Sequence, residues 1–229
     1  MIGTIVNVAT VIVGSSLGIL LQGKLSERFK QIVLQAIGLF TILIGITMVV
    51  KSQNLIEIFI SLIVGGITGE ALRLDSRLDS TMESIKNRIS PNSPHFVEGF
   101  ITATLVFCVG AMTVVGSIQE GLTGDATLLY TKSIMDGITS LTLASGLGIG
   151  VMLSAVSVLV IQGSLTLLGS HLQFLTRDIY INNLTGLGGV LIIAIGFELL
   201  SIKKMKVLNL LPSLVYLPIV IYLFELLRF

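Results

Sequence analysis

Residues 38–45 read GLFTILIG, and residues 189–196 read GVLIIAIG. The two stretches lie 151 positions apart, and their first and last glycines and two of their isoleucines coincide. At the same offset, LGILLQ at residues 17–22 matches LGSHLQ at residues 168–173 in two leucines, the glycine and the glutamine. Because both matches share one register, they indicate an internal duplication. In an apolar chain, duplication is typical of transporters and channels built from two related halves.

The composition indicates a membrane protein. Of the 229 residues, 53% are hydrophobic and 12% are charged, and the mean hydropathy is +0.97. Soluble domains carry about 25% charged residues, so we expect the excess apolar surface to face lipid. The net charge of +1 gives no argument for nucleic acid as a partner. The single cysteine excludes a disulfide framework, no Cys/His metal spacing is present, and we expect no cofactor.

Long apolar runs predict the membrane spans. A bilayer core about 30 Å thick needs about 20 apolar residues per helix, and a helix satisfies its own backbone hydrogen bonds in lipid. We therefore expect an all-α polytopic membrane protein with about eight transmembrane helices. A tight, glycine-rich turn between Ser145 and Ser157 is expected to divide the uncharged stretch 137–169. The runs begin near residues 2, 31, 55, 97, 133, 153, 181 and 206.

Basic residues gather in alternate loops, and this asymmetry predicts the orientation of a membrane protein. Ten lie on one side of the eight expected spans and four on the other. The side richer in Lys and Arg is cytoplasmic, so both termini are predicted outside and the 73–98 loop inside. The larger set is Lys24, Arg28, Lys30, Arg73, Arg77, Lys86, Arg88, Lys203, Lys204 and Lys206; the smaller is Lys51, Lys132, Arg177 and Arg228.

Orientation and duplication together predict the architecture. Helices 1–3 and 6–8 would be inverted three-helix repeats, related by a pseudo-two-fold axis in the membrane plane. They would flank a central helix pair broken by glycines. We expect a single membrane domain over residues 1–229, divided into repeat one (1–72), a cytoplasmic amphipathic segment (73–96), central broken helices (97–150) and repeat two (151–229).

The segment from 73 to 98 predicts an amphipathic helix. Leu74, Leu78, Met82 and Ile85 recur at spacings of three and four residues, with charges between them. Such a helix lies flat on a membrane face. A structural role is the main expectation, and the docking of a partner protein is the alternative.

Residues 110–140 form the most polar stretch between apolar runs. Its glycines weaken a helix, and irregular backbone inside a membrane is tolerated only where it lines protein or water. Freed carbonyls and half-helix ends then make ion ligands. The candidates for a solute or ion pathway here and in neighbouring spans are Asn7, Thr113, Ser117, Gln119, Glu120, Asp136, Ser140 and Ser145.

A second interpretation of this stretch is an ordinary external loop. In that case Lys132 and Asp136 would pair at the surface, four residues apart on one helix. We favour the loop interpretation for Asp125 and Lys132 and leave both open for Gln119, Glu120 and Asp136. For Asn7, the alternatives are an ion ligand and a hydrogen bond to a neighbouring helix.

The run FCVGAMTVVGSIQEGLTGD at residues 107–125, followed by LYTKSIMDGITSLTLASGLGIGVMLSA at 129–155, carries a family resemblance. With MIGTIVNVATVIVGSSLGILL at the start and GLGGVLIIAIGFELL near the end, it resembles the bacterial inner-membrane family called domain of unknown function 554. The resemblance covers nearly the whole chain. It implies a multi-pass protein of the bacterial cytoplasmic membrane and brings no substrate with it.

The leading hypothesis is a small secondary transporter of an unidentified small solute or ion, working as a homodimer in the lipid bilayer. Its binding site would lie at the broken helices near the bilayer midplane. The alternatives are an ion or solute channel of the same fold and a non-transporting scaffold that docks a partner through 73–96. An enzyme is not expected, because two peripheral histidines, His95 and His171, and one buried cysteine, Cys108, form no nucleophile–base pair.

Overall fold

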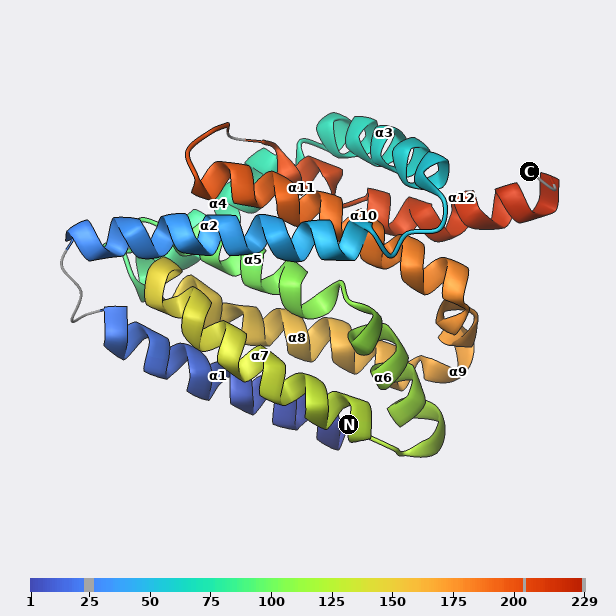
Figure 1. Cartoon of the computed structure of the whole chain (residues 1–229), viewed down its shortest axis with the longest axis horizontal. Coiled ribbons are helices and arrows are strands. Elements are labelled where there is room, and N and C mark those ends of the chain that lie inside the picture. Colours follow the sequence, from blue (N-terminus) through green and yellow to red (C-terminus); the bar gives the residue numbers. More distant parts are fainter. Residues whose placement is uncertain (23–26, 204, 228–229) are drawn as a thin grey trace.

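The chain folds into a bundle of helices (Figure 1). A computed structural model describes residues 1–22, 27–203 and 205–227, and every regular element within these ranges is a helix. The elements are α1 (Ile2–Gln22), α2 (Glu27–Val49), α3 (Leu55–Leu72), α4 (Leu74–Ile89), α5 (Phe96–Cys108), α6 (Ala111–Thr123), α7 (Thr127–Leu147), α8 (Gly150–Leu167), α9 (Gly169–Leu172), the 3-10 turn η1 (Gln173–Thr176), α10 (Asp178–Leu199), α11 (Val207–Leu210) and α12 (Ser213–Leu227).

Six segments of the described chain are long and apolar enough to cross a membrane, and the bent pair α5–α6 adds a seventh if it counts as one span. Helix α7 is not among them, although its 21 residues run alongside α1 (Figure 1). The count supported by length and hydropathy is therefore six to seven. The six segments are α1, Gln31–Val49 of α2, α3, α8, α10 and Val207–Leu227.

Apolar side chains cover the outside of this bundle. Ile5, Leu20, Leu39, Ile67 and Val215 are each more than half exposed, which is the arrangement expected where lipid is the solvent. Helix α10 has the largest buried share of the candidate spans, 67%. It lies at the centre of the bundle, beside α2 and behind it in Figure 1.

Glycines let the helices meet backbone to backbone. A Cβ added to Gly14 of α1 would collide with the carbonyl oxygen of Gly137 in α7. Between α2 and α10, a Cβ on Gly45 would lie 2.7 Å from the Gly189 oxygen, and one on Gly189 would lie 2.5 Å from the Gly45 oxygen. Small residues at crossings are the usual means of close packing in membrane bundles.

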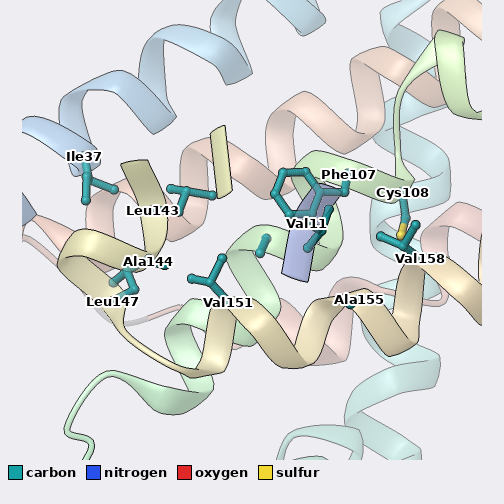
Figure 2. Close-up of a cluster of buried hydrophobic side chains, with 11 residues drawn as sticks. Val11, Ile37, Phe107, Cys108, Leu143, Ala144, Leu147, Val151, Ala155 and Val158 are labelled. Atoms are coloured by element: carbon teal, nitrogen blue, oxygen red, sulfur yellow. The ribbon is translucent and has the colours of Figure 1, made fainter. Parts of the chain in front are cut away.

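An apolar core fills the space between α1, α2, α5, α7 and α8 (Figure 2). Phe107, in the last turn of α5, is completely buried there, with Val11 of α1 beside it. The other members of the core are Ile37, Ala103, Cys108, Leu143, Ala144, Leu147, Val151, Ala155 and Val158.

The first central helix is broken. Helices α5 and α6 meet at 57° across residues 109 and 110, and Gly110 is extended, with φ −125° and ψ 152°. The Thr113 hydroxyl donates to the Phe107 carbonyl oxygen at 2.8 Å and joins the two halves. The second central helix, α7, is continuous over Thr127–Leu147, so the break lies in the first of the two.

An external loop, the second interpretation of residues 110–140, is wrong for most of this stretch, because the stretch is mostly helical. Helix α6 continues to Thr123, Gly124 ends it in the left-handed region with φ 77°, and α7 begins at Thr127. Gly121 does not break α6. Instead, it allows α6 to touch α8, because a Cβ at this position would collide with the carbonyl oxygen of Thr166.

Two local predictions are confirmed. The turn expected between Ser145 and Ser157 lies at residues 148–149, where Gly148 adopts φ 74°. The amphipathic helix is α4, whose apolar residues Leu74, Met82 and Ile85 are half-buried and whose neighbours are α3, α5 and α11. The side chain of Leu78 and the predicted cytoplasmic residues Lys24 and Lys204 lie outside the described residues.

We expect Gly14→Ala to force α1 away from α7 and to destabilise the fold by about 1–3 kcal/mol, the usual cost of overpacking. Thermal unfolding of the purified protein in detergent measures this as a lower Tm. Gly163→Ala in α8 is the matched control, because the nearest atom to its added Cβ is the flexible Met1 Cε at 3.3 Å. Equal Tm values for the two variants would contradict the close contact.

Candidate functional site

A buried amide joins three helices. Asn7 of α1 is fully buried, and its Nδ2 donates to Asp136 Oδ2 of α7 and to Gln162 Oε1 of α8, both at 2.9 Å. Gln162 Nε2 in turn donates to Thr4 Oγ1 at 3.2 Å. We call these four residues, Thr4, Asn7, Asp136 and Gln162, together with Ser117, Glu120 and Lys132, which are described below, the polar cluster.

Lys132 and Asp136 form an ion pair one turn apart on α7. Their side chains are only 6% and 10% exposed, so the surface pairing considered from the sequence is wrong, and the pair lies in the interior. The Lys132 ammonium group lies 5.9 Å from the centre of the Phe107 ring, in the last turn of α5. A helix C-terminus and an aromatic face both favour a cation.

Glu120 of α6 binds the N-terminal end of α1. Its Oε1 accepts a hydrogen bond from the Gly3 backbone nitrogen at 2.8 Å and lies 3.0 Å from the Met1 ammonium group. The first amides of a helix have no partner within the helix and carry partial positive charge. The carboxylate is thus stabilised on one oxygen while its side chain is 3% exposed.

Three oxygens of the cluster have no hydrogen-bond partner among the described residues. They are Asn7 Oδ1, Ser117 Oγ and Glu120 Oε2, each with almost no exposed area. Leaving a buried polar atom unpaired costs about 1–3 kcal/mol, and such atoms are rare in folded proteins. The arrangement therefore suits a polar ligand held between α1 and α6.

The cluster extends from one end of the bundle to its middle. Asn7 is five residues into α1, which places it about 8 Å from the start of that helix. Asp136 is nine residues into α7, close to the middle of its 21 residues. The cluster thus occupies the half of the bundle that contains the N-terminal end of α1.

The remaining predicted residues lie elsewhere or serve the helices themselves. Gln119 donates to Asp125 in the turn between α6 and α7 at 2.8 Å. Ser140 and Ser145 donate to carbonyl oxygens of their own helix, those of Gly137 and Thr142. Thr113 bridges the break between α5 and α6, as described above. None of these four contributes an unpaired oxygen among the described atoms.

Sequence reasoning missed Gln162 and misjudged Lys132. Gln162 is fully buried in α8. The sequence feature that could have identified it is an amide side chain in a span, Gly150–Leu167, that has no charged residue. For Lys132, its spacing of four residues from Asp136 indicated the ion pair. Burial could not be inferred from that spacing, because it depends on which helices surround α7.

A second buried carboxylate, Glu57 of α3, has partners for both oxygens. Asn54 Nδ2 donates to Oε1 at 3.0 Å, and Asn183 Nδ2 of α10 donates to Oε2 at 2.6 Å. Asn183 Oδ1 also accepts from the Gln53 nitrogen at 2.8 Å. This group therefore fastens the α2–α3 turn to α10 and offers a comparison for the polar cluster.

Comparison with known proteins identifies relatives over nearly the full chain. The family model described as "Protein of unknown function (DUF554)" matches residues 2–222. The "Uncharacterized membrane protein YdfK" of Bacillus subtilis (strain 168) is 35% identical over 226 residues, which cover 97% of this chain and 96% of the relative. The "Uncharacterized protein YqgA" of Escherichia coli (strain K12) is 30% identical over 218 residues, or 93% of each chain. No solved structure matches this chain.

We expect Lys132→Met to destabilise the fold by about 3–5 kcal/mol, because it leaves the buried Asp136 carboxylate without its cation. Adding Asp136→Asn should restore most of the loss, since the unpaired charge is then removed. Thermal unfolding of the two single variants and the double variant measures the coupling. Lys206→Met, at an exposed pair with Glu70, is the control and should change Tm little. Additive losses in the double variant would contradict a coupled buried pair.

The Asp125 carboxylate, outside the membrane spans, gives a pH prediction. Its Oδ1 accepts from the Thr127 hydroxyl at 2.7 Å and the Thr127 nitrogen at 3.0 Å, and these bonds, with that from Gln119, lower the pKa of Asp125 below its usual range. A lowered pKa means that the stabilisation is present above the unfolded-state pKa and is lost as pH falls through the folded-state value. We expect Asp125→Asn to flatten the fall of Tm between about pH 5 and pH 3. Parallel pH curves for variant and wild type would contradict this.

Proposed function

This chain belongs to the DUF554 family, and we propose that it works as a small secondary transporter that moves a small solute or ion through the polar cluster. The observation that carries the proposal is the set of buried, partly unpaired polar groups inside an apolar, multi-pass bundle. Ionisable groups are costly inside a membrane and mark substrate or ion pathways there. The other buried carboxylate, Glu57, has partners for both oxygens, whereas Glu120 Oε2 has none among the described residues.

The broken helix beside the cluster supports this proposal. The α5–α6 break at residues 109–110 places a helix C-terminus next to Lys132, whose ammonium group lies 5.9 Å from the Phe107 ring centre. Transporters use such half-helix ends to hold charged cargo or coupling ions. The broken pair therefore supplies an element that can change shape without unfolding a whole span.

The directions of the helices support the inverted repeat that we include in the proposal. In Figure 1, α1, α3 and α10 run from right to left, whereas α2, α8 and α12 run from left to right. The 151-residue offset pairs α1 with α8, α2 with α10 and α3 with α12, and each pair runs in opposite directions. This is the relation that a pseudo-two-fold axis in the membrane plane requires.

Contacts between the duplicated glycines give a second line of support. A Cβ on Gly45 would lie 2.7 Å from the Gly189 oxygen, and a Cβ on Gly196 would lie 3.2 Å from the Gly38 oxygen. The 151-residue offset makes Gly45 equivalent to Gly196 and Gly38 equivalent to Gly189. The contact of Gly45 with the Gly189 oxygen is therefore equivalent to the contact of Gly196 with the Gly38 oxygen. A two-fold axis passing between α2 and α10 explains this reciprocity.

The proposal includes two further predictions from the sequence. Both termini would lie outside a bacterial cytoplasmic membrane, with α4 on the inner face. In Figure 1 the N-terminal end of α1 and the C-terminal end of α12 are directed to one side, and α4 lies toward the other, which agrees with this orientation. The homodimer stays a prediction, in which a second copy gives the moving half a rigid frame.

Uptake into proteoliposomes tests the proposal, with a panel of ions and small metabolites and an imposed gradient. We expect Glu120→Gln and Asp136→Asn each to lower uptake by about tenfold or more, the equivalent of one lost charge-assisted hydrogen bond. Glu57→Gln is the matched control, a buried carboxylate outside the cluster, and should leave uptake unchanged. Unchanged uptake in both cluster variants would remove the cluster from the mechanism.

The same assay separates the alternatives. A channel never accumulates its solute against a gradient, whereas a coupled transporter does. A scaffold would show no flux for any solute, and its capture of a cytosolic partner would require the α4 segment.

A further inference from the structure

The geometry points to a binding site for a monovalent metal cation between α1 and α6, with Asn7 Oδ1, Ser117 Oγ and Glu120 Oε2 as its oxygen ligands. This inference rests on the same cluster as the proposed transport function and names the class of ion that the cluster takes. It starts from the three buried oxygens that have no partner in the described part of the chain.

The register between α1 and α6 places the residues that carry these oxygens on adjacent turns of the two helices. The bond from the Gly3 nitrogen to Glu120 Oε1 fixes α1 against α6 at 2.8 Å, and the two helices run in opposite directions there (Figure 1). Ser117 lies one turn before Glu120, and Asn7 lies one turn after Gly3. Residues three or four apart share a helix face, so Ser117 is placed opposite Asn7.

The face of α6 that carries Ser117 is turned inward. Thr113, Ser117 and Glu120 follow at spacings of four and three residues, and all three are buried. The Thr113 hydroxyl is used by the Phe107 carbonyl oxygen, whereas Ser117 Oγ has no partner among the described residues. The free oxygens of this face therefore begin at Ser117 and continue to Glu120.

The orientation of the Asn7 amide is determined by its neighbours. Its NH2 group faces two acceptors, Asp136 Oδ2 and Gln162 Oε1. The Asp136 carboxylate can only accept, so the NH2 group of Asn7 must lie on its side, and Gln162 Nε2 is then left to donate to Thr4 Oγ1. Reversing the Asn7 amide would set its oxygen against both acceptors, so Asn7 Oδ1 is the end left free, and an amide oxygen only accepts.

The ligand set selects the class of ion. A carboxylate oxygen and an amide oxygen only accept hydrogen bonds, and with a hydroxyl oxygen they suit hard cations. Calcium takes six to eight oxygens, and magnesium requires near-octahedral geometry. This site offers three free oxygens and one carboxylate, so a single positive charge fits it better than two.

The Met1 ammonium group shows that Glu120 accepts a cation in this fold. It lies 3.0 Å from Glu120 Oε1, on a residue that is 41% exposed. An ion that binds Oε2 would neutralise the same carboxylate, and the ammonium group can then turn to water without a buried charge being left unpaired.

Radioactive sodium binding to the purified full-length protein in detergent tests the site. We expect saturable binding of 22Na⁺ that unlabelled Na⁺ displaces, with Li⁺, K⁺ and Ca²⁺ as further competitors to rank the ions. Ser117→Ala and Glu120→Gln should each weaken binding at least about tenfold. Ser154→Ala is the matched control, a fully buried serine of α8 whose hydroxyl donates to the Val151 carbonyl oxygen, and it should bind as the wild type does.

Thermal unfolding in sodium chloride and in choline chloride gives a second readout that does not depend on the label. A ligand that binds only the folded state raises Tm, so sodium should stabilise the wild type and Ser154→Ala. Ser117→Ala should lose this rise in Tm. In choline chloride, its Tm should be no lower than that of the wild type. The reason is that the hydroxyl it removes has no partner in the described structure.

Wild-type sodium binding in Ser117→Ala and Glu120→Gln would overturn the site. So would the absence of any saturable monovalent ion binding, which would leave water or a proton as the occupant. Failure of the transport proposal is a separate result: sodium would bind as described, while no solute crosses proteoliposomes. If uptake depends on Asp136 but no cation binds, the transport proposal is retained and the metal site is rejected.

Discussion

The buried ion pair between Lys132 and Asp136 constrains the interior, because neither charge reaches water. Each group needs a partner within the bundle, and the Asp136 carboxylate finds two, the Lys132 ammonium group and the Asn7 amide. The amide then orients Gln162, and Gln162 reaches Thr4. One charge pair on α7 thus determines how side chains on α1 and α8 must face, and a change at any of them disturbs the others.

Close backbone contact seals this network from lipid. Gly14 brings α1 against Gly137 of α7, and Gly121 brings α6 against Thr166 of α8. Lipid chains provide no hydrogen bonds, so a polar cluster in a membrane must be enclosed by its own helices. The glycines therefore serve the polar cluster as well as the packing, because they let the helices approach closely enough to enclose its unpaired oxygens.

Much of the fold could be predicted from the sequence, because lipid imposes a length and an apolar composition on each span. The starts of α1, α3 and α5, the turn at Gly148 and the amphipathic α4 follow from such local patterns. The helical range 116–123 could not be predicted, since Gly116 and Gly121 resemble helix breakers until their neighbours are known. Asn7, Glu120 and Asp136 were found as polar residues in or next to apolar runs. The burial of Lys132 and the role of Gln162 depend on which helices pack together, which periodicity does not specify.

Thiol accessibility at the centre of the cluster tests most directly whether cargo reaches it. In a Cys108→Ala background, Ser117→Cys places the one thiol of the protein between α1 and α6. Membrane-impermeant thiol reagents are then applied to right-side-out and inside-out vesicles. We expect labelling from each side, as a carrier alternates between its two open forms. A thiol that reacts from neither side until the protein is denatured would contradict the account and make the cluster a permanently closed structural core.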